Sequence, residues 1–189
     1  PVESNNGDEI EIEVFPDRPD LLSHETMAKA IRAFIGVGSP ENKVEVSKGD
    51  FCIEVDQSLG ARRPIIMGAI VRSVNTGNGP LERDLFIQSL MDHQEKLHMT
   101  LGRKRSFSSI GVHDLSRLSP PFRYVSVTKD FSFTPLASEK EMSISEVLSS
   151  HPKGMEYSSL MEVLDSFPII LDSNDMVISF PPVINGSPT

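Results

Sequence analysis

The segment 167–186 constrains the fold more than any other part of the chain, because two short apolar runs there flank four small polar residues. The runs are Phe167–Leu171 and Met176–Phe180, and the residues between them, Asp172–Asp175, favour a tight turn. Pro181–Pro182 ends the second run, because two prolines remove two backbone donors and fix two φ angles. The pattern predicts a β-hairpin followed by a stiff corner.

Two polar residues stand on either side of this corner. Ser179 precedes the prolines and Asn185 follows them. A hydroxyl and a carboxamide held in this way can contact a small ligand while losing little side-chain entropy. The alternative is a hairpin whose polar ends satisfy only backbone groups, and physical chemistry alone favours that interpretation.

The composition is that of a soluble globular protein of one or two domains, with 38% hydrophobic and 24% charged residues among 189. No apolar run approaches the roughly 20 residues that span a bilayer, and no signal-peptide pattern is seen, so we expect no membrane partner. Cys52 is the only cysteine, which excludes an internal disulfide and favours a reducing, cytoplasmic location. Because Pro1 is not an initiator methionine and Thr189 follows an unfinished apolar hairpin, we expect a piece of a longer protein.

The formal net charge of −9 argues against binding of nucleic acid along the whole surface, so any RNA contact has to be local. The best candidate is the cluster Arg103, Lys104 and Arg105, with Arg62–Arg63 as a second basic pair. The cluster follows a predicted helix, where positive charge also offsets the helix dipole. Phosphate binding and helix stabilisation both explain it.

Strands and helices alternate irregularly along the chain, which predicts the α+β class. Helices are expected after Ser23, over 81–101 with Gly102 as its C-terminal cap, after the capping box Ser143–Glu146, and over 157–164. Strands are expected near 8–15, 44–46, 51–55, 65–74, 109–113 and 122–128, besides the hairpin. We expect a small N-terminal α/β unit over residues 1–60 and a mixed-sheet domain with packed helices over 61–189, incomplete at its C-terminus, with Arg62–Arg63–Pro64 as the boundary.

The histidines do not predict a metal site. His93 and His98 are five residues apart, which places them about 140° apart around a helix. His113–Asp114 could be a base and its orienting carboxylate, but adjacent strand residues point to opposite faces, so a hydrogen-bonded histidine at a strand end is the favoured interpretation. Neither a glycine-rich phosphate loop nor a nucleophilic serine elbow is present.

Five motifs, in order, resemble those of one known family. They are Asp17–Ser23, Gln94–His98 leading to Gly102–Arg105, Ile110–Asp114, His151–Tyr157, and the hairpin with Ile178–Asn185. Together they cover nearly the whole chain and resemble the editing region of the phenylalanyl-tRNA synthetase beta subunit in its archaeal and eukaryotic form.

The resemblance implies a function in protein synthesis. In such synthetases the alpha subunit makes phenylalanyl-tRNA, and the beta subunit hydrolyses tyrosyl-tRNA(Phe), the mischarged product. Ile170, where the family has leucine, would shape the ring pocket. Ser179 and Asn185 would bind polar groups of the amino acid or position the attacking water. Further site residues of the family lie beyond Asn185, so we expect the fragment alone to be an incomplete catalyst.

The resemblance also implies partners and cofactors. The partners would be the tRNA(Phe) 3′ end carrying tyrosine and the alpha subunit, in a heterotetramer of two alpha and two beta chains. Editing would need no cofactor and no metal, whereas the whole synthetase uses ATP and Mg²⁺. The alternative is a non-catalytic module of the same synthetase that contacts tRNA or the alpha subunit. A small-molecule-binding α+β domain is the interpretation that needs no family.

Overall fold

The chain forms two compact units in the computed structural model, which describes residues 1–39, 44–60 and 65–189. Unit 1 comprises Pro1–Val46 and Ser73–Ser108, and unit 2 comprises Ser47–Arg72 and Ser109–Thr189. Each unit is thus built from two separate stretches, a grouping that differs from a single division after residue 60. The expected boundary at Arg62–Arg63–Pro64 lies outside the described residues.

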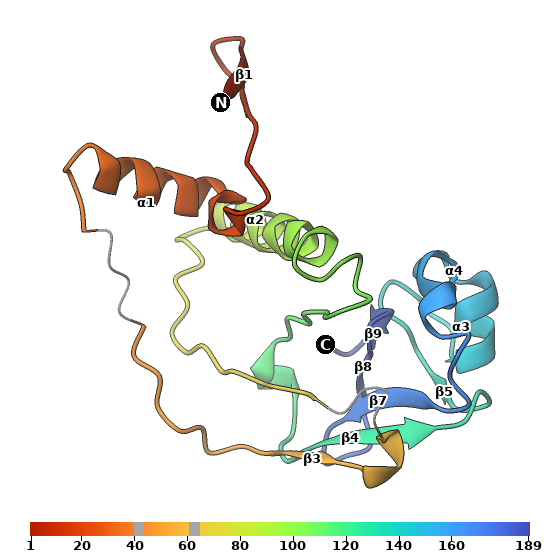
Figure 1. Ribbon diagram of the computed structural model, residues 1–189. Coiled ribbons are helices and arrows are strands. Elements are labelled where there is room, and N and C mark those ends of the chain that lie inside the picture. The colour runs from red at the N-terminus through yellow and green to blue at the C-terminus, as the bar shows by residue number, and fades with distance from the viewer. Residues whose placement is uncertain (40–43, 61–64) are drawn as a thin grey trace. The chain divides into compact units, whose positions relative to one another are not determined.

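Unit 2 contains a five-stranded mixed sheet in the order β3-β4-β7-β8-β9 (Figure 1). The strands are β3 (Ile53–Val55), β4 (Phe122–Val127), β7 (Phe167–Leu171), β8 (Val177–Phe180) and β9 (Ile184–Asn185). β3 runs parallel to β4, and the other neighbours are antiparallel. The hairpin predicted around Asp172–Asp175 is confirmed as β7 and β8, and the α+β class is confirmed with it.

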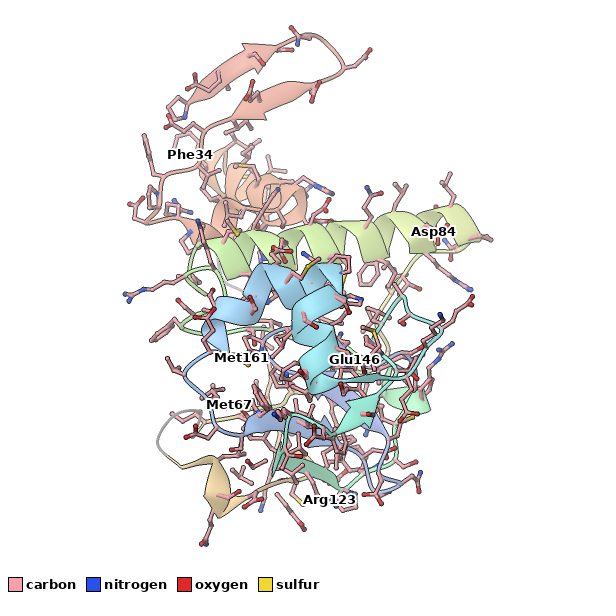
Figure 2. The ribbon with its side chains drawn as sticks, turned by 90° about the vertical axis from the view of Figure 1, so that its right-hand side faces the viewer. Phe34, Met67, Asp84, Arg123, Glu146 and Met161 are labelled. Atoms are coloured by element: carbon pink, nitrogen blue, oxygen red, sulfur yellow. The ribbon has the colours of Figure 1, made fainter. Side chains whose placement is uncertain are left out.

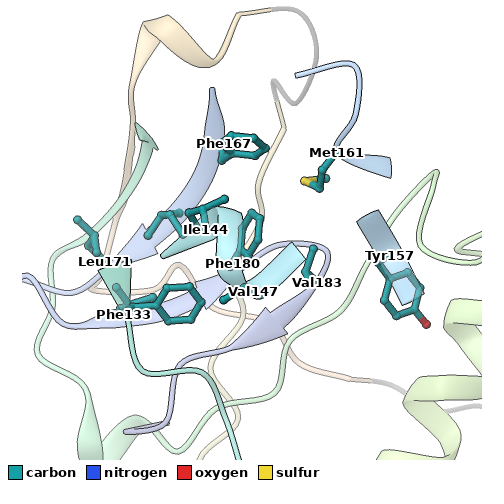
Figure 3. Packing of buried hydrophobic residues seen from close by; sticks show 11 residues of the cluster. Phe133, Ile144, Val147, Tyr157, Met161, Phe167, Leu171, Phe180 and Val183 are labelled. Atoms are coloured by element: carbon teal, nitrogen blue, oxygen red, sulfur yellow. The ribbon is translucent and has the colours of Figure 1, made fainter. Parts of the chain in front are cut away.

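One face of this sheet packs on two short helices, α3 (Ile144–Ser150) and α4 (Pro152–Tyr157). The predicted capping box starts α3: Ser143 Oγ accepts from the Glu146 N–H at 3.2 Å, and Glu146 Oε2 accepts from the Ser143 N–H at 2.7 Å. Phe180 forms edge-to-face contacts with Phe133 and Phe167, with ring centroids 6.3 and 6.2 Å apart (Figure 3). The core of unit 2 consists of Phe133, Ile144, Val147, Tyr157, Met161, Phe167, Ile169, Leu171, Val177, Phe180 and Val183.

Short elements complete unit 2. Strands β5 (Ser132–Phe133) and β6 (Met142–Ser143) form a two-stranded antiparallel ladder. Three 3-10 turns, η2 (Gln57–Leu59), η3 (Leu115–Arg117) and η4 (Ser158–Leu160), connect the main elements.

Unit 1 contains the hairpin of β1 (Val2–Asn5) and β2 (Ile10–Ile12), the turn η1 (Pro19–Leu21), and the helices α1 (His24–Phe34) and α2 (Pro80–Met99). The predicted cap of α1 is confirmed, since Ser23 Oγ accepts from the Thr26 N–H at 3.2 Å. Among the described residues of this unit, only His98 and Gly102 are fully buried. Phe34, at the end of α1 (Figure 2), is 92% exposed, so this large apolar side chain is not covered.

Three predicted strands are wrong: 44–46, 65–74 and 109–113 have irregular backbone. A strand exists only when its backbone groups pair with a neighbour, and apolar alternation alone does not supply one. Val46, Ile65 and Met67 are more than three quarters exposed, which agrees with the absence of pairing.

The last predicted helix, at 157–164, is also misplaced. The structure has α4 at Pro152–Tyr157 instead, followed by η4. Pro152 stands at the first helical position, where its missing N–H and restricted φ favour a helix start. His151 Nδ1 caps that start by accepting from the Lys153 N–H at 3.2 Å.

Candidate functional site

The three residues predicted at the hairpin lie side by side across three strands. Ile170 of β7 pairs with Ser179 of β8, and Ser179 pairs with Asn185 of β9. Residues paired directly across a sheet project from the same face. The row continues to Tyr124 of β4, which pairs with Ile170, and from there to Val55 of β3.

A β-bulge turns Ser179 toward this row. On β7, the neighbours Ile170 and Leu171 pair with Ser179 and Val177, so one extra residue of β8 lies between the two pairs. Leu171 and Val177 belong to the core cluster, whereas Ile170 and Ser179 do not. Because neighbouring strand residues project from opposite faces, the bulge keeps Val177 in the core and places Ser179 on the other face.

Ser179 and Asn185 contact each other through their side chains. Ser179, which is 6% exposed, donates from Oγ to Asn185 Oδ1 at 3.2 Å, with Ile184 O as a second acceptor at 3.4 Å. Neither acceptor is a base that could activate the hydroxyl as a nucleophile. The pairing leaves the oxygen lone pairs of Ser179 and the amide N–H donors of Asn185 for other partners.

The turn that holds β7 against β8 depends on the buried carboxylate of Asp172. Its Oδ1 accepts from the N–H groups of Asn174 and Met176 at 2.8 and 3.0 Å, and its Oδ2 accepts from the Ser119 N–H at 3.1 Å. Arg123 of β4 forms an ion pair with Asp175 in the same turn. These bonds set the register of the hairpin and, through it, the row at Ile170 and Ser179.

The basic cluster predicted to bind RNA forms the turn after α2. Arg103, Lys104 and Arg105 all have positive φ, at 48°, 55° and 63°. The prediction that Gly102 is the C-terminal cap of α2 is wrong, because the helix ends at Met99 and Thr100 is its cap. The glycine serves close packing instead: a Cβ there would lie 2.6 Å from Ser108 O and 2.7 Å from His98 O.

The three cations differ in their surroundings. Arg105 is 13% exposed and donates to Glu95 Oε2 at 2.8 Å, and His98 Nδ1 lies 3.1 Å from the same oxygen. Burial of Glu95 disfavours its charged form, but the hydrogen bonds from Arg105 and His98 outweigh burial and lower the pKa of this carboxyl. Arg103 and Lys104 are exposed. Arg105 is therefore an internal anchor of the turn, and the other two cations face solvent.

The remaining sequence candidates do not form a further site. His113 lies in irregular backbone, and its buried Nδ1 has no hydrogen-bond partner within the described residues, so the expected hydrogen-bonded strand-end histidine is wrong. Within residues 1–39, 44–60 and 65–189, no three His, Cys, Asp or Glu side chains are grouped closely enough to hold a metal ion. No helix in the described part of the chain is long and apolar enough to cross a membrane.

Sequence reasoning missed two residues beside these sites. Tyr124, 3% exposed, stands next to Ile170 in the row, and only the long-range pairing of β4 with β7 reveals it. Phe107 is 73% exposed and lies under the Arg103 guanidinium, 5.4 Å from the ring centroid. The sequence signal for Phe107 was an aromatic residue two positions after three cations.

Comparison with known proteins identifies relatives over the whole chain, although no protein-family model matches it. The chain is 44% identical over 188 residues to the phenylalanine–tRNA ligase beta subunit of Archaeoglobus fulgidus and 42% identical over 188 residues to that of Methanococcoides burtonii. These matches cover 100% of this chain but 33% and 34% of those proteins, so the chain spans about a third of the curated relatives it matches.

A solved structure agrees with the sequence relatives. The crystal structure of an N-terminal fragment of the phenylalanyl-tRNA synthetase beta subunit from Pyrococcus horikoshii matches with a TM-score of 0.75 and 32% identity. That match covers 90% of this chain and 48% of the other. The chain is therefore homologous, over its whole length, to a segment of the phenylalanine–tRNA ligase beta subunit.

Proposed function

We propose that the chain is the editing region of such a beta subunit and that it contributes to hydrolysis of tyrosyl-tRNA(Phe). The observation that carries this proposal is the row formed by Ile170, Ser179 and Asn185 on adjacent strands. These are the residues that the family resemblance assigns to the amino-acid pocket. The row combines an apolar side chain with a hydroxyl and a carboxamide. This combination suits a tyrosyl group, which has an aromatic ring and polar groups at both ends of it.

The physical need for such a site follows from the difference between two amino acids. Tyrosine is phenylalanine plus one hydroxyl. An apolar pocket used for aminoacylation therefore favours phenylalanine over tyrosine by only about a hundredfold. A second site that hydrogen-bonds the phenol can favour tyrosine by roughly 10⁴, because phenylalanine would leave the polar groups of that site unpaired. Ile170 and the neighbouring ring of Tyr124 would form the apolar wall of this pocket.

The polar pair suits ester hydrolysis by a bound water. A water placed between them would donate to Ser179 Oγ and accept from the amide N–H of Asn185, because the hydroxyl already donates to Asn185 Oδ1. Hydrolysis by such a water needs no covalent intermediate with the protein. Holding the water in a fixed position supplies much of the rate acceleration in reactions of this kind.

The wider assignments extend the family resemblance and are proposed with it. The partners we propose are the 3′ end of tRNA(Phe) carrying tyrosine and the synthetase alpha subunit, in an assembly of two alpha and two beta chains in the cytoplasm. ATP and Mg²⁺ would be used in aminoacylation by the whole enzyme, and editing at the row would need neither.

The test is release of tyrosine from preformed tyrosyl-tRNA(Phe) by the intact enzyme, comparing wild type with Ser179→Ala and Asn185→Ala. We expect up to about a hundredfold slower release, because loss of either group frees the bound water from its position. Aminoacylation with phenylalanine should stay near the wild-type rate.

A matched control is Ser126→Ala, which removes a hydroxyl in the same sheet that donates to Ser166 Oγ at 2.7 Å but lies outside the row. This variant should release tyrosine normally. Unchanged release by Ser179→Ala and Asn185→Ala would contradict the proposal, and equal loss of editing and aminoacylation would show a folding defect instead.

A second candidate is a non-catalytic module of the same synthetase. Phe34, Ile35 and Val37 at the end of α1 are 92%, 61% and 60% exposed, and exposed apolar clusters are typical of protein contacts. If this candidate is right, substitution of these residues by serine weakens assembly with the alpha subunit, while variants of the row leave tyrosine release unchanged.

A further inference from the structure

We propose that the turn after α2 is a binding site for single-stranded RNA, in which Arg103 and Lys104 contact phosphates and Phe107 stacks on a nucleobase. The proposal rests on the proposed function and refines the RNA contact predicted from the sequence, since it replaces Arg105 by Phe107 and gives each residue one task. All the residues involved belong to unit 1.

The backbone of the turn is unusual for residues that carry a Cβ. Three consecutive residues, Arg103–Arg105, adopt the left-handed conformation, which is unfavourable for side chains other than glycine. The surrounding hydrogen bonds hold it: the Arg103 N–H donates to Thr100 O at 3.0 Å, and the Ser106 hydroxyl donates to Arg103 O at 2.6 Å. Costly backbone geometry of this kind persists where the structure enforces it and is concentrated at functional sites.

Arg105 anchors the turn to α2. Its side chain is 13% exposed and forms the ion pair with Glu95, next to the buried His98. This pairing neutralises one of the three cations. The charge that remains for a ligand is therefore that of Arg103 and Lys104.

Arg103, one of these two cations, stands beside an exposed aromatic ring. Phe107 is 73% exposed, and the Arg103 guanidinium lies over one face of its ring at 5.4 Å from the centroid. The contact orients the guanidinium and the ring together, which lowers the entropy lost when a ligand binds. The exposed ring offers a flat surface for stacking, and the exposed side chains of Arg103 and Lys104 offer donors for phosphate oxygens.

Single-stranded RNA matches this chemistry. Non-specific binding of single strands combines cations that follow the backbone with aromatic rings on which bases stack. The net charge of −9 means that the rest of the chain repels a polyanion, so attraction has to come from a local site such as this one. An acidic protein would match the two cations but would make no use of the exposed ring.

The experiment measures the affinity of the intact protein for a tRNA(Phe) transcript at several salt concentrations. Arg103→Ala with Lys104→Ala should weaken binding and reduce the salt slope by about 1.4, the expected contribution of two phosphate contacts on a single strand. Phe107→Ala should weaken binding about tenfold while leaving the salt slope unchanged, because stacking releases no counterions. Phe107→Tyr should restore affinity.

Two controls separate binding from folding. Arg32→Ala with Arg83→Ala removes the same charge at exposed positions of α1 and α2 and should leave affinity unchanged. Lys104→Gly suits the left-handed backbone, so a loss of affinity in this variant reports the lost charge and not a distorted turn.

Wild-type affinity and salt slope in the Arg103/Lys104 variant would overturn the proposal, and so would full affinity in Phe107→Ala. Neither result depends on editing, because uncharged tRNA carries no ester bond that the row around Ser179 could hydrolyse. Failure of the editing proposal and failure of this one are therefore seen in different measurements.

Discussion

At the scale of single residues, His113 connects the fold to pH. Burial lowers the pKa of this histidine below its ordinary value of 6.5, and its Nδ1 makes no hydrogen bond within the described residues. The folded chain therefore binds a proton at His113 less tightly than the unfolded chain does. Its neutral form is compatible with full stability above about pH 6.5, and stability should fall as the pH drops from there toward the lower pKa of the folded state.

The measurement is urea unfolding of wild type and His113→Gln between pH 7 and pH 5. Glutamine cannot gain the proton, so the variant should lose less stability over this range than the wild type. Parallel pH profiles for the two proteins would show that protonation of His113 is not coupled to folding.

The candidate site itself shows how far single residues could be predicted. Ser179 and Asn185 are near each other in sequence, so the hairpin and its corner indicated that they lie together. Tyr124 could not be found in this way, because its place beside Ile170 depends on the pairing of two strands that are far apart in the sequence, β4 and β7. The β-bulge that turns Ser179 away from the core depends equally on tertiary pairing and has no signal in the apolar run.

At the scale of elements, the packing of α4 against α3 depends on Gly154. A Cβ at this position would lie 1.7 Å from Val147 O, so the two helices would have to move apart. Gly154→Ala should lower the free energy of unfolding by about 1–3 kcal/mol, the typical cost of overpacking, although alanine favours helices. Chemical denaturation monitored by circular dichroism measures this change.

Gly49→Ala is the matched control. Nothing lies within 4 Å of a Cβ at Gly49, and its φ is not positive, so the same methyl group should be neutral or slightly stabilising there. Equal stability of the two variants would mean that α3 and α4 have room to separate.

Local chemistry predicted some elements well and others not at all. The caps at Ser23 and Ser143 depend on residues three positions apart, so the sequence alone indicated where α1 and α3 begin. The segments 44–46, 65–74 and 109–113 have strand-like composition but irregular backbone, because pairing partners decide whether a strand forms.

At the scale of the whole molecule, the two units differ in how much they bury. Unit 2 has a continuous apolar core, whereas the described residues of unit 1 bury only His98 and Gly102. Regions with few buried contacts open locally at low cost. Backbone amides of α1 and α2 should therefore exchange with deuterium faster than those of β7 and β8, and mass spectrometry of the intact protein measures this.

Helix α3 is the control, since it is a helix like α2 but buries Ile144 and Val147. It should be protected nearly as well as the strands. If α2 is as slow to exchange as α3, the apolar side chains of unit 1 are covered in solution, and the difference in stability between the units does not exist.

The α+β class could be predicted from the alternation of patterns, but the interleaving of the units could not. Strand β3 of unit 2 lies in Ser47–Arg72, which precedes the second stretch of unit 1, Ser73–Ser108. It pairs in parallel with β4. Parallel neighbours need a long connection between them, and nothing in the composition of that connection shows which strand it leads to.

The same path has a consequence for synthesis on the ribosome. The 66 residues from 56 to 121 separate the end of β3 from the start of β4, so the nascent chain carries the first strand of the sheet long before its neighbour exists. At elongation rates of about 5–20 residues per second, β3 waits for roughly 3–13 seconds. The residues of α2 are synthesised within this interval, so the helix can form before β4 is available to pair with β3.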